Sequence, residues 1–202
     1  IAYGEFEGYN LKITGNHIGV SVNGGGKLID CLIEDNTTGV QWSSADNGIF
    51  SNNSVYKNDI GFKGYRFRGS VTGNDFSENT RAVVLSRSKA FLGDNIFTKN
   101  DFGLVNSNGS QTRTSVFRDI TVHSISLNNR FKNNTTASKN DFQSTLDLGR
   151  YSPDATEATG GWNQFSSNSA YDLVNQSCIS MLAQINKWVD GPKLSGLAIV
   201  HP

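Results

Sequence analysis

The sequence repeats a short phrase at intervals of about 21 residues, and this repeat constrains the fold more than any other feature. In each copy an Asn follows an apolar residue by three positions and precedes a Gly or Ala by three, as in Ile33, Asn36 and Gly39. The first five of these Asn residues are 20, 22, 21 and 21 positions apart, and two further copies follow after gaps of 34. The series comprises Asn16, Asn36, Asn58, Asn79, Asn100, Asn134 and Asn168. Such a period indicates a solenoid, in which each unit packs against its neighbours.

A second polar column lies two residues before the apolar residue of each copy. Its members are Leu11, Cys31, Asn53, Asn74, Asn95, Asn129, Asn163 and Asn186. If successive units stack at about 4.8 Å, like residues come into contact along the stack. Each side-chain amide can then donate to the carbonyl oxygen of the next, which satisfies a buried polar turn. The spacing therefore predicts ladders of stacked amides.

Apolar and polar residues alternate within each unit, which is typical of strands rather than helices. In the strand after the Gly, the residues expected to point inward are Val20, Val22, Val40, Trp42, Phe62, Val83, Leu85 and Leu104. Two outward rows are expected, one of Ser21, Gln41, Lys63, Val84 and Val105, the other of Asn23, Ser43, Tyr65, Ser86 and Ser107. In the last copy Tyr171 replaces the Gly, and the following strand is shifted by one residue.

We therefore predict an all-β fold, a single-stranded right-handed parallel β-helix (β-solenoid) of about eight coils of about 21 residues, with the hand set by the usual crossover preference. One domain would span residues 1–202, with 1–9 as an N-terminal cap or partial coil and 189–202 as a C-terminal cap. Segments 107–126 and 146–161 lengthen two coils and are expected to emerge as loops. Leucine-rich repeats are the rival at this period, but they need several Leu residues and a helical segment in each unit.

The composition narrows the classes of partner. A net charge of zero argues against a nucleic-acid-binding protein, which would carry a basic excess. No apolar run is long enough to span a membrane. Cys31 and Cys178 fit no metal spacing, and we expect two buried thiols rather than a disulfide. No motif indicates a cofactor or a metal. Because Ile1 rather than Met begins strand-like sequence, we expect a processed or excised piece.

The repeated phrase N-x-[FIV]-x-x-N-x-x-G-[VFL]-x-[VWL] resembles the parallel β-helix repeat of pectin-lyase-like proteins, and LAQINKWVDGP is similar to the last coil of several secreted members. The resemblance covers residues from about 10 to 192. It implies the fold and, more weakly, a carbohydrate ligand on the outer face of the strand after the Gly, because this fold carries many activities. The sequence lacks the Gly-His-Gly and Asp-Asp motifs of polygalacturonases and the Asp-Pro-His motif of alginate epimerases.

The stretch FKGYRFRG carries the main candidate site. It places Lys63, Tyr65, Arg66 and Arg68 around one strand end, and Arg87 and Lys89 follow one coil later. Arginine pairs with carboxylates and tyrosine can stack on a sugar ring. We therefore take Lys63 and Arg66 as candidate catalytic residues. The candidate substrate-binding residues are Tyr65, Arg68, Arg87 and Gln41. The alternative is a solvated basic edge that discourages association.

Carboxylates give a weaker signal. Glu34 with Asp35, Asp75 with Glu78, and Asp94 are candidates for a glycosidase pair. Most of them adjoin Asn or Gly, where Asp commonly stabilises a turn instead.

Together these features favour an extracytoplasmic protein, secreted or at the cell surface, that binds a polysaccharide or surface glycan. A lyase or hydrolase activity on an acidic glycan is left open, and so is whether the protein is an enzyme. The alternative is a non-catalytic structural module of the adhesin or tailspike type, which would associate with copies of itself as a homo-oligomer.

Overall fold

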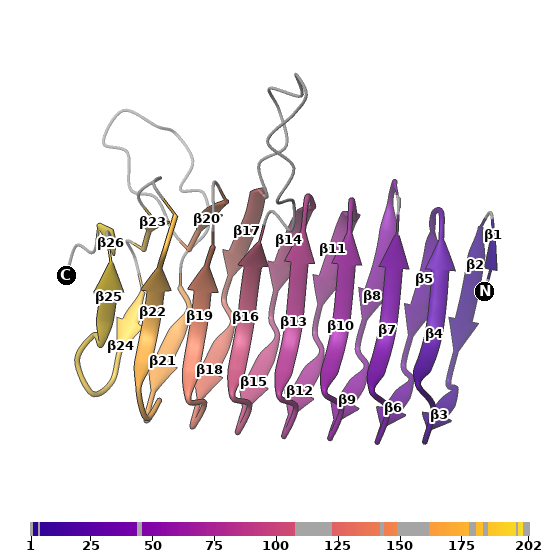
Figure 1. Cartoon of the computed structure of the whole chain (residues 1–202), viewed down its shortest axis with the longest axis horizontal. Helices are drawn as coiled ribbons and strands as arrows, with labels where there is room; N and C mark the ends of the chain where they lie inside the picture. Colours follow the sequence, from indigo (N-terminus) through magenta and orange to yellow (C-terminus); the bar gives the residue numbers. More distant parts are fainter. Residues whose placement is uncertain are drawn as a thin grey trace.

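The chain folds into an elongated parallel β-helix whose strands form three sheets (Figure 1). The computed structural model describes residues 2–3, 5–43, 46–107, 123–141, 144–148, 162–177, 181–183, 186–196 and 198–199. Each full coil contributes one strand to each of three sheets, A, B and C, and all strand pairs of the described residues are parallel, as Ile60–Tyr65 with Arg81–Ser86. The predicted fold class is confirmed. The described residues contain no helix, so the leucine-rich alternative is wrong.

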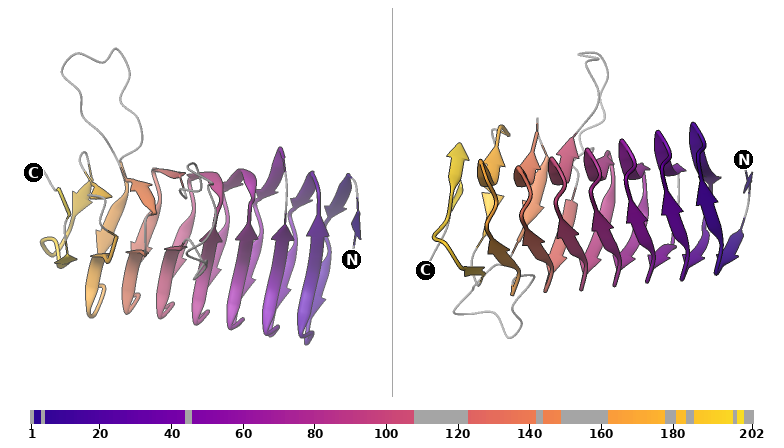
Figure 2. Two further views of the ribbon diagram at one scale, coloured as in Figure 1. Left: turned by 45° about the horizontal axis from the view of Figure 1, so that its top comes forward. Right: turned by 90° about the horizontal axis from the view of Figure 1, so that it is seen from below.

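Within the described residues, sheets A, B and C contain nine, nine and eight strands. Sheet A consists of β1 (Ala2–Tyr3), β4 (Ile18–Asn23), β7 (Thr38–Ser43), β10 (Ile60–Tyr65), β13 (Arg81–Ser86), β16 (Phe102–Ser107), β19 (Thr136–Asn140), β22 (Tyr171–Asn175) and β25 (Leu194–Gly196). Sheet B consists of β2 (Phe6–Tyr9), β5 (Gly26–Ile29), β8 (Gly48–Ser51), β11 (Arg68–Thr72), β14 (Lys89–Gly93), β17 (His123–Leu127), β20 (Thr145–Asp147), β23 (Met181–Leu182) and β26 (Ala198–Ile199). Sheet C consists of β3 (Lys12–Thr14), β6 (Leu32–Glu34), β9 (Ser54–Tyr56), β12 (Asp75–Ser77), β15 (Ile96–Thr98), β18 (Arg130–Lys132), β21 (Gln164–Ser166) and β24 (Lys187–Trp188). The coils stack in sequence order from one end to the other (Figure 2).

The interior is filled by side chains that repeat from coil to coil. All of the residues expected to point inward from sheet A are fully buried except Val20, which lies near the N-terminal end of the solenoid and is partly buried. Sheet C contributes a column of near-parallel aromatic rings, with centroids 4.5–5.2 Å apart. This column comprises Phe76, Phe97, Phe131, Phe165 and Trp188. Repetition of one residue type at one position therefore lets identical side chains pack on each other in register.

In both predicted columns the Asn residues form hydrogen-bonded ladders. At the corner between sheets C and A, Asn58 donates its side-chain amide to Asn79 Oδ1 at 3.0 Å, and Asn79 donates to Asn100 Oδ1 at 3.1 Å. At the corner between sheets B and C, Asn53 donates to Asn74 in the same way at 3.0 Å. The backbone N–H of each rung donates to the same oxygen. The ladders satisfy buried polar turns that would otherwise destabilise the interior.

A residue in the left-handed conformation marks most of the corners. At the corner between sheets C and A, Asp35, Lys57, Glu78 and Lys99 have φ values of 54° to 57°. Non-Gly residues rarely adopt this conformation, which carries a cost of about 1–2 kcal/mol each. Lys57, Glu78 and Lys99 thereby place long charged side chains at successive turns of this corner.

Close coil-to-coil contact explains the Gly and Ala residues that follow the Asn residues of the ladder at the corner between sheets C and A. A Cβ atom at Gly39 would lie 2.7 Å from the carbonyl oxygen of Gly61. The one-residue shift expected in the last copy is present, because Tyr171 pairs with Thr136 and Asp172 falls in the column that holds Gly or Ala elsewhere.

Several expectations fall on residues outside the described part. The segments 108–122 and 149–161, and with them most of both expected loops, belong to that group, as does Cys178. Cys31 is a free, buried thiol, and its burial raises its pKa. In the part of the chain that the structure describes, no helix is long and apolar enough to cross a membrane.

Candidate anion-binding site at the corner between sheets A and B

The outer face of sheet A brings three of the candidate residues together. Lys63 and Tyr65 point outward from β10 and are exposed, as the alternation predicts. Gln41 of β7 is the register partner of Lys63 on the preceding coil. Residues two apart on one strand lie about 6.7 Å from each other, so Lys63 and Tyr65 are neighbours on this face.

Arg66 and Arg87 lie over the ring of Tyr65. Both occupy the left-handed corner position where sheet A passes into sheet B, with φ values of 51° and 50°. Their guanidinium carbons lie 5.5 Å and 5.9 Å from the centroid of the Tyr65 ring. Arg87 Nη1 also donates to the Tyr65 hydroxyl at 3.3 Å. The two guanidinium groups, from successive coils, are therefore gathered around one aromatic ring.

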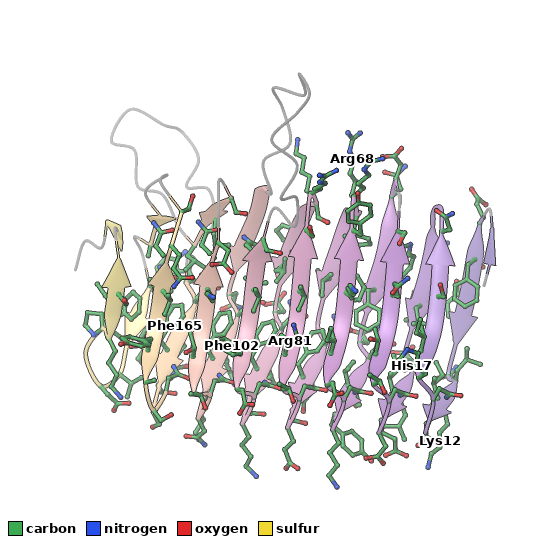
Figure 3. All side chains as sticks on the ribbon, in the orientation of Figure 1. Lys12, His17, Arg68, Arg81, Phe102 and Phe165 are labelled. Atoms are coloured by element: carbon green, nitrogen blue, oxygen red, sulfur yellow. The ribbon has the colours of Figure 1, made fainter. Side chains whose placement is uncertain are left out.

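Arg68 and Lys89 extend the positive charge into sheet B. They begin β11 and β14 and are direct register partners on successive coils. Arg68 lies at the upper edge of the solenoid in Figure 3, where sheet A meets sheet B. Arg68 Nη1 lies 3.5 Å from Asp46 Oδ1 of the preceding coil, and both side chains are largely exposed. We call Lys63, Tyr65, Arg66, Arg68, Arg87 and Lys89 the cationic corner.

The cationic corner stacks like charges, whereas three ion pairs elsewhere on the solenoid join opposite charges on adjacent coils. Lys12 lies 2.9 Å from Glu34, Lys27 lies 3.1 Å from Glu7, and Lys99 lies 3.6 Å from Glu78. The hydrogen bond between Glu7 and Lys27 lowers the pKa of the carboxyl and raises the pKa of the ammonium. Like charges directly opposite each other in a sheet are destabilising. Arg68 lies directly opposite Lys89, so this pair taken by itself is unfavourable for the fold, and Arg66 and Arg87 bring like charges to equivalent corner positions of the same two coils.

The carboxylates considered as catalytic pairs are engaged in other contacts. Glu34 is buried on sheet C, where it accepts from the Tyr56 hydroxyl as well as pairing with Lys12. Asp35, Glu78 and Asp94 all occupy left-handed corner positions. Asp94 also accepts from the Asn128 side-chain amide at 2.6 Å. The positions of Asp35, Glu78 and Asp94 therefore favour the interpretation that these carboxylates stabilise turns.

Asp75 differs from the other carboxylates. It points outward from β12, and burial raises its pKa. Across the described ranges, no group of three or more His, Cys, Asp or Glu side chains is arranged to hold a metal ion.

Sequence reasoning missed Asp46. It lies in the variable stretch between β7 and β8, where the repeat does not dictate the residue. Its only signal is its position one coil before Arg68, which requires the strand register to be known. In contrast, the repeat itself predicts that the residues of the cationic corner lie close together. Their role as a binding site stays a prediction.

The comparisons with known proteins support the fold. The family model described as the right-handed β-helix region matches residues 9–180. The chain therefore belongs to this family, and its β-helix is right-handed. Comparisons with curated proteins and with solved structures give no match. The family defines an architecture that hosts many activities, so any function must be argued from the site.

Proposed function

We propose that the protein binds an acidic polysaccharide or surface glycan through the cationic corner. Such partners are met outside the cytoplasm, so the proposal includes an extracytoplasmic location. The observation that carries it is the stacking of like charges on adjacent coils: Arg66 beside Arg87 and Arg68 beside Lys89.

Electrostatics gives the physical reason. Two unit charges about 4 Å apart interact by roughly 1 kcal/mol even in water. The fold uses opposite charges at equivalent neighbouring positions, as in Glu78 and Lys99. A bound polyanion would turn the repulsion at the cationic corner into attraction, since guanidinium groups pair with carboxylate oxygens. Functional sites are where a sequence is expected to depart from its own structural rules.

We propose that the Tyr65 ring has a role other than stacking on a sugar, which is the role expected from the sequence. The guanidinium groups of Arg66 and Arg87 lie over the ring. We therefore propose that Tyr65 positions the two arginines and that the anionic groups of the glycan are bound by the guanidinium N–H groups.

Binding without turnover is the function that the geometry supports best. Glycoside hydrolysis requires two carboxyl groups about 5–10 Å apart across the bond that is cleaved. Among the described residues of this corner, Asp46 is the carboxylate in contact with the cations, and it is paired with Arg68.

The test is calorimetric titration with a uronate polymer and with a neutral glucan of similar length. The expected result is binding of the uronate polymer alone, weakened by salt. The double variant Arg66→Gln/Arg87→Gln should lose about tenfold or more in affinity, equivalent to about 1.4 kcal/mol. Lys132→Gln is the matched control, because Lys132 is an exposed cation on sheet C. Equal binding of both polymers, or unchanged affinity of the double variant, would overturn the proposal. An increase in ultraviolet absorbance during titration would instead reveal lyase activity.

A further inference from the structure

Asp46 limits the cationic corner on its N-terminal side. Its carboxylate lies 3.5 Å from Arg68 Nη1, and Lys89 flanks Arg68 on the other side through the strand register. Arg68 therefore lies between the carboxylate of Asp46 on the preceding coil and the ammonium group of Lys89 on the following coil. Arg66 and Arg87 contact Tyr65 instead.

We infer that Asp46 is a specificity-determining residue that competes with the ligand's anionic groups for Arg68. The inference rests on the proposed function. An anionic group bound by Arg68 must displace the Asp46 carboxylate or share the guanidinium with it. Either event opposes binding, because the ligand's anionic group comes close to the like-charged carboxylate of Asp46. Asp46 thereby favours ligands whose anionic groups are bound by Arg66, Arg87 and Lys89, on the C-terminal side of Arg68.

The exposure of the pair sets the size of the effect. The Arg68 side chain is 71% exposed and that of Asp46 is 78% exposed. Exposed ion pairs contribute about 0.2–1 kcal/mol, which corresponds to a change in affinity of up to about fivefold. The competition is therefore weak enough for a polyanion to overcome and large enough to measure.

A double-mutant cycle on the full chain tests the inference, with polygalacturonate as the ligand. Asp46→Asn should bind it about two- to fivefold more tightly than the wild type, and this gain should disappear when Arg68 is replaced by Gln. Asp46→Glu retains the charge and should show no gain. Glu78→Gln is the matched control, because it removes a comparable exposed pair with Lys99 at another corner and should leave affinity unchanged.

The outcomes separate the two claims. If the wild type binds and Asp46→Asn binds no more tightly, the inference is wrong and the proposed function stands. If the gain persists without Arg68, Asp46 acts only through net charge and direct competition is wrong. If neither the wild type nor Asp46→Asn binds, the proposed function fails and the inference fails with it.

Discussion

Asn168 donates its side-chain amide to the carboxylate of Asp172 at 2.7 Å, and this contact ends the ladder at the corner between sheets C and A. In every earlier rung the amide donates to the Asn of the next coil. Asp172 also accepts from the backbone N–H of Lys193 at 2.9 Å. An ionised carboxylate only accepts hydrogen bonds. Asp172 therefore satisfies the last amide and the backbone of the following coil together.

Replacing Asp172 with Ala should destabilise the C-terminal coils. The substitution leaves the Lys193 N–H without this acceptor and removes the charge-assisted bond from Asn168, at a cost of about 2–3 kcal/mol. Urea unfolding measures the change. Asp190→Ala is the control, since Asp190 accepts from the Ser167 N–H at an exposed position. Equal losses in the two variants would show that burial of the ladder end is unimportant.

Replacing an Asn in the middle of the same ladder should lower the free energy of unfolding more than replacing the Asn at its exposed first rung. Asn79 is buried, donates to Val55 O as well as to Asn100, and accepts from both donors of Asn58. Asn79→Ala should lower the free energy of unfolding by about 3 kcal/mol or more, because several buried groups lose partners at once. At the exposed first rung, Asn16→Ala should cost less than about 1 kcal/mol. Similar values from chemical denaturation would contradict a cooperative ladder.

Cys31 interrupts the other ladder and offers a stabilising substitution. It donates its backbone N–H to Asn53 Oδ1, while its thiol lies 3.2 Å from Ile29 O and 3.9 Å from Gly8 O and accepts from the Leu11 N–H at 3.4 Å. An Asn side chain here could donate to Asn53 Oδ1 and Gly8 O, as Asn53 does to Asn74 Oδ1 and Leu28 O. Cys31→Asn should therefore raise stability by about 1 kcal/mol, measured by thermal unfolding. Cys31→Ser is too short to reach both groups, and an Asn variant less stable than the Ser variant would refute the prediction.

Asp75 should make stability depend on pH. Burial raises its pKa above the ordinary value of 3.8, so the folded state holds the proton more tightly than the unfolded state. Its contribution is therefore fully present below pH 3.8 and is lost as the pH rises through the folded-state pKa. Relative to wild type, Asp75→Asn should be more stable at pH 7 than at pH 3. A difference in unfolding free energy that is independent of pH would contradict this assignment.

The structural features that recur in every repeat could be predicted from the sequence. The Asn79 rung and the inward Phe62 follow from spacing and alternation, because a solenoid places equivalent positions in contact. The cationic corner follows for the same reason, since Arg66 and Arg87 are 21 positions apart. The pairing of Arg68 with Asp46 and the ladder end at Asp172 could not be predicted, because both depend on side chains where one coil departs from the repeat.

Charge reversal at Lys89 tests most directly the claim that the cationic corner opposes stability and serves a ligand. The measurement is the free energy of unfolding of Lys89→Glu at low salt, with and without polygalacturonate. A Glu beside Arg68 should raise stability by up to about 1 kcal/mol without the polymer, as opposite charges replace like charges. The same variant should gain less from the polymer than wild type, because the ligand stabilises only by binding the folded state. Lys132→Glu carries the same change in net charge and should keep the full gain. A Lys89→Glu variant that is less stable alone, or that gains as much from the polymer as wild type, would contradict the account.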